Sequence, residues 1–224
     1  VQYLTEQEKE DSETYYSGRS FIAPNGIISN NEQAALEKKP ITGVFIGRYS
    51  IWQKGIDLLF SAIMRKKEIL EKYNIRFELY GPDERTGSSQ DVKKMAIENG
   101  IDKIVSINGP VFDNEKKEVL LNASFFIHTS RFEGMPMSVL EALSYGIPCL
   151  VTQGSNMRED VCRFNAGWGA DNNVESIERA FIKICDSLSE LKIKGENAKK
   201  LASEYSWSSI SQNCHDIFYK LIKN

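Results

Sequence analysis

The stretch GVFIGRYSIWQKGIDLLFSAIMRKKEILEKYNIRFELYG, residues 43–81, carries the pattern that decides the fold. It opens with a short apolar run and continues through a segment, residues 55–73, that repeats apolar residues at helical spacing. It closes with a second apolar run over residues 75–81. A strand, a helix and a strand in this order predict a parallel pair joined by a right-handed crossover.

The same alternation continues along the chain. Residues 174–222 then follow a helical pattern, with breaks predicted near Gly195 and Ser206. The fold class is therefore α/β, a doubly wound parallel sheet with extra helices at the carboxyl end. The predicted strands are 43–48, 75–81, 103–109, 124–129 and 148–152, and the predicted helices are 55–73, 89–99, 114–122 (capped by Asp113) and 137–146 (between Pro136 and Gly146).

Three segments follow from this pattern. Residues 1–40 are polar, carry a turn signal at Pro24, and are predicted to be a lead-in from another domain. Residues 41–205 form the predicted α/β domain, and residues 206–224 form a terminal helix. Because the chain lacks an initiator Met, we expect it to be a fragment whose amino-terminal domain is missing.

Composition narrows the possible partners. The net charge is −3, from 28 basic and 31 acidic residues, which argues against nucleic acid as the main partner. The four cysteines form no C-x-x-C pair and the chain has two histidines, so no zinc site is expected and a reducing compartment is favoured. No apolar run approaches the roughly 18–20 residues that a membrane span needs.

Two loops at the carboxyl ends of predicted strands are where a ligand is expected, because such sheets bind ligands there. The first, residues 47–55, matches neither a dinucleotide fingerprint nor a Walker loop. It carries Arg48 and Lys54, whose charges suit a diphosphate. The alternative is a pair of solvated surface cations.

The second loop leads from residue 128 into the helix that contains Glu141. Glu133 and Gly134 precede this helix, and free N–H groups at a helix start can bind an anion. The two carboxylates could accept hydrogen bonds from sugar or ribose hydroxyls. Alternatively, Glu141 lies on an exposed helix face, or the two acids form a hydrolase pair, which would have no use for the phosphate-binding loop.

Taken together, these motifs resemble family 4 of the glycosyltransferases, which retain the anomeric configuration of the donor sugar and have the two-domain GT-B architecture. The resemblance covers about residues 20–222 and implies a Rossmann-like carboxyl-terminal domain. The matching segments are FIAPNGI, GRYSIWQKGIDLL, RFEGMPMSVLEALSYGIPCLVT, which holds an E-x7-E signature, and EYSW.

The resemblance implies a role for each candidate residue. Arg48 and Lys54 would neutralise the donor diphosphate, and Glu133 would bind the transferred sugar. Glu141 would hold the ribose, and backbone near Val111 would face the base. The backbone around Gly134, Met135 and Pro136 would contact sugar and phosphates, although Met135 stands where the family has a larger residue, which leaves the sugar preference open.

The resemblance also implies the partners. A nucleoside-diphosphate sugar would be the substrate, with no cofactor and no metal, and the missing domain would bind an acceptor sugar or glycolipid. The enzyme would be cytoplasmic, could associate peripherally with the inner face of the membrane, and would serve polysaccharide or glycoconjugate synthesis. The isolated fragment would be inactive. Two alternatives stay open, a silent nucleotide-sugar-binding module and a nucleotide-sugar epimerase, for which His128 is the one strand-end histidine.

Overall fold

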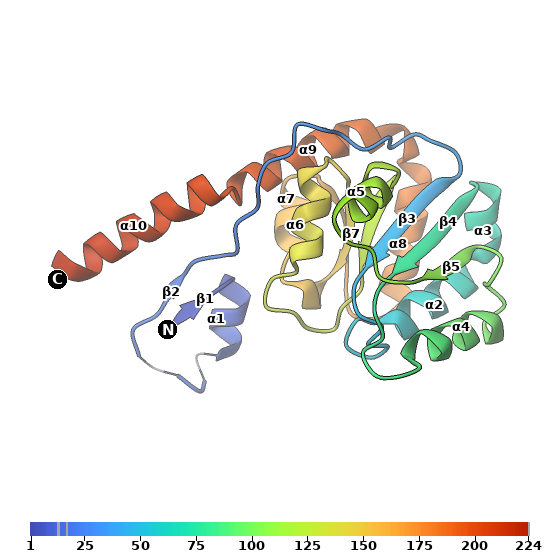
Figure 1. Ribbon diagram of the computed structural model, residues 1–224, viewed down its shortest axis with the longest axis horizontal. Helices are drawn as coiled ribbons and strands as arrows, with labels where there is room; N and C mark the ends of the chain where they lie inside the picture. Colours follow the sequence, from blue (N-terminus) through green and yellow to red (C-terminus); the bar gives the residue numbers. More distant parts are fainter. Residues whose placement is uncertain (13, 17, 224) are drawn as a thin grey trace.

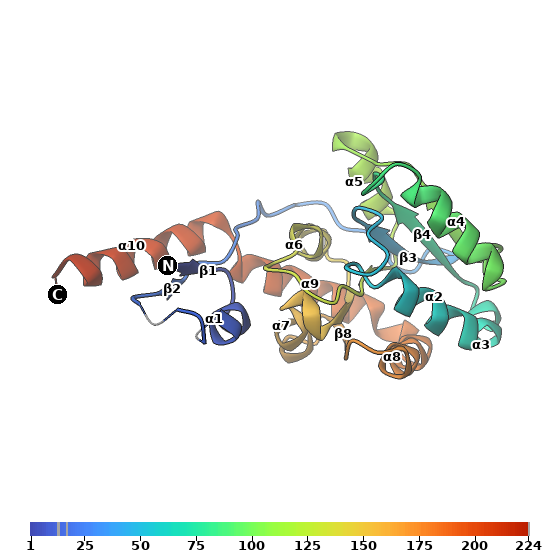
Figure 2. The same ribbon diagram turned by 90° about the horizontal axis from the view of Figure 1, so that it is seen from below.

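The computed structural model describes residues 1–12, 14–16 and 18–223, with the backbone alone at 221–223. An α/β body forms most of it, and a small amino-terminal unit lies beside this body next to the long terminal helix (Figures 1 and 2). Among the described residues, no helix is both long and apolar enough to cross a membrane.

The main sheet is parallel throughout, which confirms the predicted fold class. Within the described residues its strand order is β5-β4-β3-β6-β7-β8. Strand β8 was not predicted, because its sequence GWGA alternates glycine with other residues and shows no apolar run. The strands are β3 (Ile41–Ile46), β4 (Ile75–Tyr80), β5 (Val105–Asn108), β6 (Phe125–His128), β7 (Cys149–Thr152) and β8 (Gly167–Ala170).

Helices cover both faces of this sheet, as right-handed crossovers require. On one face, α2 (Ile56–Arg65) and α3 (Lys67–Lys72) pack against α8 (Val174–Asp186), and α4 (Ser88–Glu98) lies beside α2. On the other face, α6 (Met137–Ser144) and α7 (Arg158–Arg163) pack against α9 (Leu191–Glu204). Helix α5 (Asp113–Leu121) joins β5 to β6, and α10 (Trp207–Lys223) ends the chain.

The core lies between these layers. Phe77 of β4 packs against Phe125 of β6 and Phe181 of α8, with ring centroids 6.3 and 5.5 Å away. Burying each such side chain contributes roughly 1.5–3 kcal/mol. A Cβ atom at Gly43 of β3 would lie 2.6 Å from the Phe125 ring, so glycine is needed where β3 and β6 pair.

The structure corrects three details of the predicted helices. The segment 55–73 is two helices that meet at Lys66. Gly195 does not break a helix but lies inside α9, where a Cβ would meet the carbonyl oxygen of Gly146 at 2.6 Å; the break falls earlier, at the short 3-10 turn Leu188–Glu190. Asp113 is the first residue of α5 and makes no capping hydrogen bond.

The amino-terminal unit has structure that its polar sequence did not indicate. Strands β1 (Gln2–Tyr3) and β2 (Phe21–Ile22) are parallel, with α1 (Glu6–Ser12) between them. Thr5 and Glu8 hold the start of α1 in an arrangement close to a capping box: the Glu8 N–H donates to Thr5 Oγ1, and Glu8 Oε2 accepts from the N–H of Leu4, one residue before Thr5. Helix α10 reaches this unit, where Phe218 packs edge-on against Phe21 at 5.3 Å.

Candidate functional site

The two candidate loops follow the two strands at which the sheet reverses direction. The chain adds β4 and β5 on one side of β3, then returns and adds β6 on the other side. The loops after β3 and β6, residues 47–55 and 129–136, therefore lie together outside the carboxyl edge of the sheet. In doubly wound sheets this switch point is where ligands bind.

Glycine lets these loops approach backbone to backbone. Gly55 has a φ of +62°, and a Cβ there would lie 2.1 Å from the carbonyl oxygen of Thr129. The Thr129 hydroxyl in turn donates to the carbonyl oxygens of Lys54, at 3.0 Å, and Gly55, at 3.2 Å. This contact sets Lys54 beside the loop that carries Glu133.

Lys54 and Glu133 form the centre of the site. Their Nζ and Oε1 atoms lie 2.5 Å apart, and the two side chains are 12% and 15% exposed. Ser130 Oγ donates to the same Oε1 at 2.8 Å, and His128 Nε2 lies 3.4 Å from it. Burial alone would raise the pKa of Glu133, but the adjacent side chains of His128 and Lys54 outweigh burial and lower this pKa to about 2. Glu133 is therefore a carboxylate at neutral pH.

The backbone around Glu133 is fixed as firmly as its side chain. Asn156, itself at a φ of +57°, donates from Nδ2 to the carbonyl oxygens of Glu133 and Gly134. The next residue, Met135, is buried at the start of α6, as is Pro136. Among the described residues, no acceptor takes the N–H groups of Gly134 and Met135, so both remain available to an anion.

Arg48 lies on the same loop as Lys54 but points elsewhere. Its side chain is 55% exposed, and its guanidinium is 3.7 Å from Glu84 and 3.5 Å from the amide oxygen of Gln53. The next residue, Tyr49, is buried and its hydroxyl donates to the carbonyl oxygens at the ends of β4 and β5. The loop is thus anchored to the sheet, while the two predicted cations do not touch.

Glu141 occupies a separate pocket of about 400 Å³. It forms an ion pair with Lys116 of α5, and both side chains are 28% exposed. Val111 is half-buried on the loop that leads into α5. The structure therefore brings Lys54 and Glu133 together and leaves Glu141 with Lys116. The pocket is lined by residues of α5 and α6, by Trp207 and by the linker residues Gly26, Ile27, Ile28 and Asn30.

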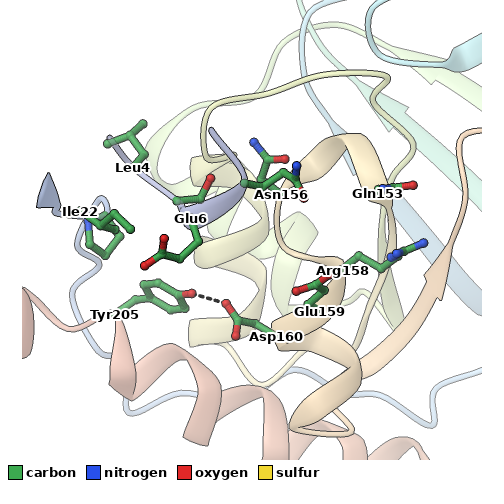
Figure 3. A pocket seen from close by; sticks show the side chains of 12 residues that line it. Leu4, Glu6, Ile22, Gln153, Asn156, Arg158, Glu159, Asp160 and Tyr205 are labelled. Carbon is green, nitrogen blue, oxygen red and sulfur yellow. Dashed lines mark hydrogen bonds between the residues drawn. The ribbon is translucent and has the colours of Figure 1, made fainter. Parts of the chain in front are cut away.

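A second pocket, of about 260 Å³, lies between the amino-terminal unit and the body (Figure 3). Leu4 and Ile22 line one side of it and Asn156 and Asp160 the other, and the Tyr205 hydroxyl donates to Asp160 at 2.5 Å. A Cβ at Gly134 would lie 3.3 Å from Leu4, so the unit borders the candidate site. Sequence reasoning missed this; the T-x-x-E capping box was the one available signal.

Within the described residues, no group of three or more His, Cys, Asp or Glu side chains gathers as a metal site would require. Cys149 lies in β7 and is fully buried.

Comparisons with a family model and with known sequences agree on one family of proteins. Residues 27–201 match the model of the family described as glycosyl transferases group 1. The chain is 30% identical over 193 residues to an uncharacterized glycosyltransferase of Methanocaldococcus jannaschii, covering 83% of this chain and 46% of that protein. It is 27% identical over 142 residues to the alpha-1,3/1,6-mannosyltransferase ALG2 of Dictyostelium discoideum, covering 63% and 34%. The chain thus spans half or less of the length of these relatives.

Solved structures agree on the fold. The glycosyltransferase WaaG of lipopolysaccharide biosynthesis superposes with a TM-score of 0.77 at 20% identity, covering 96% of this chain and 61% of WaaG. Anabaena HepE in complex with UDP and glucose superposes with a TM-score of 0.76 at 16% identity, covering 98% and 63%. At these identities the likeness establishes the Rossmann-like GT-B fold.

Proposed function

The chain belongs to the glycosyl transferases group 1 family, and on that premise we propose that it is the donor-binding half of a retaining glycosyltransferase of family 4. The whole protein would transfer a sugar from a nucleoside-diphosphate sugar to an acceptor in polysaccharide or glycoconjugate synthesis. The observation that carries this proposal is the Lys54–Glu133 pair, held by two strand-end loops at the switch point of the sheet.

The geometry suits departure of a diphosphate. As the bond to the sugar breaks, negative charge grows on the leaving phosphate, and donors fixed in advance stabilise this charge best. Lys54 and the free N–H groups of Gly134 and Met135 are such donors. Arg48 is exposed on the same loop, so in this proposal it turns from Glu84 to the diphosphate when the donor binds.

The nucleoside would occupy the pocket that holds Glu141. Its carboxylate would accept hydrogen bonds from the ribose hydroxyls, and the backbone near Val111, which precedes α5, would face the base. Lys116 already contacts Glu141, so ribose and lysine would share this carboxylate.

We further propose that residues 1–25 belong to a second domain, which binds the acceptor. A two-stranded parallel sheet is marginal alone and leaves edge groups unpaired. Phe218 of α10 also packs on Phe21 of this unit, as expected for a helix that returns to the second domain. The acceptor would be a sugar or a glycolipid, and a glycolipid acceptor would bring the cytoplasmic enzyme to the inner face of a membrane.

Isothermal calorimetry with UDP, GDP, ADP and their sugar conjugates tests donor binding. We expect one nucleotide series to bind the wild-type chain and Glu141→Ala to weaken this binding at least about tenfold, the cost of about one charged hydrogen bond. Glu98→Ala, the same change at an exposed position on α4, is the matched control and should bind like the wild type. If neither this chain nor the full-length protein binds any of these nucleotides at high concentration, donor binding is wrong.

Retention is tested on the full-length protein. The anomeric configuration of the first-formed product, followed by proton NMR, should equal that of the donor. An inverted product would remove the chain from the retaining class while leaving donor binding intact.

A further inference from the structure

The two oxygens of Glu133 have different surroundings. Oε1 accepts hydrogen bonds from Lys54 at 2.5 Å and from Ser130 at 2.8 Å, and it lies 3.4 Å from His128 Nε2. Oε2 receives none of the hydrogen bonds that the described residues form. The carboxylate is thus anchored by one oxygen and leaves the other for a ligand.

His128 is a deeply buried polar member of this cluster, as is Ser130. It lies at the end of β6, is 1% exposed, and stacks on Phe45 with ring centroids 6.5 Å apart. Its Nε2 lies 3.0 Å from Ser130 Oγ, whereas its buried Nδ1 has no hydrogen-bond partner among the residues that the structure describes. An apolar side chain could pack there without an unpaired nitrogen, so packing alone does not account for a histidine.

The surroundings select one form of the imidazole. Burial lowers the pKa of His128 and Lys54 acts in the same direction, while Glu133 opposes them, so the ring is neutral at pH 7. With the proton on Nε2, the ring donates to Ser130 and the Ser130 hydroxyl is free to donate to Glu133. With the proton on Nδ1, a bare Nε2 would face the carboxylate, and Ser130 would have to donate to the ring instead.

We propose that His128 is a positioning residue, whose Nε2–H acts through the Ser130 hydroxyl to hold Oε1 of Glu133 and so direct Oε2 toward the transferred sugar. The identity of the sugar as ligand rests on the proposed function; the hydrogen-bond relay itself does not. Lys54, on the loop after β3, binds the same Oε1 atom. This oxygen is therefore held from both loops, by Lys54 on one and by Ser130 on the other.

The relay is tested first without any ligand. Because the sequence holds only His128 and His215, chain labelled with ¹⁵N-histidine gives two ring patterns in long-range ¹H–¹⁵N NMR spectra. We expect one ring to be the neutral Nε2–H form at pH 7 to 8, and Ser130→Ala to shift its Nε2 resonance. An Nδ1–H or a charged ring, or an Nε2 resonance unmoved by Ser130→Ala, overturns the relay.

The effect on the ligand is tested by comparing UDP with UDP-glucose, GDP with GDP-mannose, and ADP with ADP-glucose, in the calorimeter. In Ser130→Ala and His128→Phe, the preference for the sugar conjugate over its nucleotide should fall about tenfold, while nucleotide affinity stays unchanged. His128→Gln, which restores an N–H donor, should recover most of this preference, and Ser130→Thr should retain it.

The outcomes separate the two proposals. An equal loss of nucleotide and sugar-conjugate affinity would mean a general disturbance of the loop and would overturn the positioning role. If His128→Phe does not fold, as judged by near-UV circular dichroism, Ser130→Ala and the wild-type NMR spectrum still decide. If the wild type binds none of the nucleotides, the proposed function fails, whereas the tautomer and its response to Ser130→Ala still test the relay.

Discussion

Glu133 and Glu141 are eight residues apart in one motif, yet they lie in very different surroundings. Glu133 lies on a loop, where Lys54 and Ser130 hold its side chain and Asn156 holds its backbone carbonyl. Glu141 lies on the side of α6 and meets Lys116 in an open pocket. The position of Glu133 is fixed by hydrogen bonds to both its side chain and its backbone. The position of the Glu141 carboxylate depends on two flexible side chains, its own and that of Lys116.

The difference between the two glutamates shows which position suits stabilisation of the transition state and which suits binding of the nucleoside. A group that stabilises developing charge has to be in place before the reaction, since reorganisation costs part of its effect. A group that holds the unreacting nucleoside can adjust as the ligand arrives. We therefore expect changes near Glu133 to affect both stability and chemistry, and changes near Glu141 to affect mainly nucleotide affinity.

The largest expected effect comes from moving the loop backbone. In Gly55→Ala, the new Cβ would meet the Thr129 carbonyl at 2.1 Å and the residue would keep a left-handed φ. We expect the free energy of unfolding to fall by about 3–4 kcal/mol, measured by urea titration. Gly87→Ala is the matched control, because Gly87 also has a positive φ but an open surrounding, and it should cost about 1 kcal/mol. Equal losses would mean that the close contact is unimportant.

A smaller effect is expected from removing the central cation. Because the folded pKa of Glu133 lies near 2, below its ordinary value of 4.5, its stabilising contribution is complete above about pH 4.5 and is lost as the pH falls toward 2. Lys54→Met should lower the free energy of unfolding by about 2 kcal/mol at pH 7, and the difference from wild type should shrink at pH 3.5. Lys94→Met, in an exposed pair with Glu98, should change little at either pH. A Lys54→Met penalty that is independent of pH would contradict this account.

The Glu141 pocket should respond mainly in affinity. Lys116→Met removes a partly exposed ion pair, so the free energy of unfolding should fall by less than about 1 kcal/mol. Freed of this competitor, Glu141 should bind the nucleotide about threefold more tightly by calorimetry. Lys117→Met serves as control, since Lys117 lines the same pocket but pairs with Glu32. Weaker binding in Lys116→Met would show that the lysine itself contacts the nucleotide.

The smallest effect on stability is expected at Arg48. Within the described part of the chain its exposed side chain makes only long polar contacts, so Arg48→Ala should change the free energy of unfolding by no more than about 0.5 kcal/mol. In the full-length enzyme the same change should lower kcat as well as nucleotide affinity. A rise in KM with kcat unchanged would mean that Arg48 binds the ground state and the transition state equally.

The parts of this molecule that the sequence predicted are those set by local pattern. Apolar runs alternating with helical segments fixed the parallel sheet, and the switch point then placed the loops of Lys54 and Glu133 together. The start of α6 at Pro136 and its end near Gly146 also followed from local signals.

The parts that were missed depend on contacts distant in the sequence. The first residue of β8 has to be glycine, because a Cβ at Gly167 would lie 2.0 Å from the carbonyl oxygen of Cys149, and no local pattern reveals that contact. The partner of Glu141 depends on how α5 lies beside α6, and the direction of Arg48 depends on its rotamer. The His128–Ser130 contact likewise depends on side-chain geometry, although both residues were on the predicted loop.

The strand order has a consequence for how the chain acquires its fold. Strands β3, β4 and β5 pair with near neighbours in sequence, as do β6, β7 and β8, whereas the two sets meet through the pairing of Gly43 with Phe125, 82 residues apart. Closing so long a loop is entropically slow compared with forming either half. We therefore expect each half to gain hydrogen-exchange protection early during refolding and the β3–β6 pairing to gain it late. The ligand pocket, which lies at this pairing, would then form last.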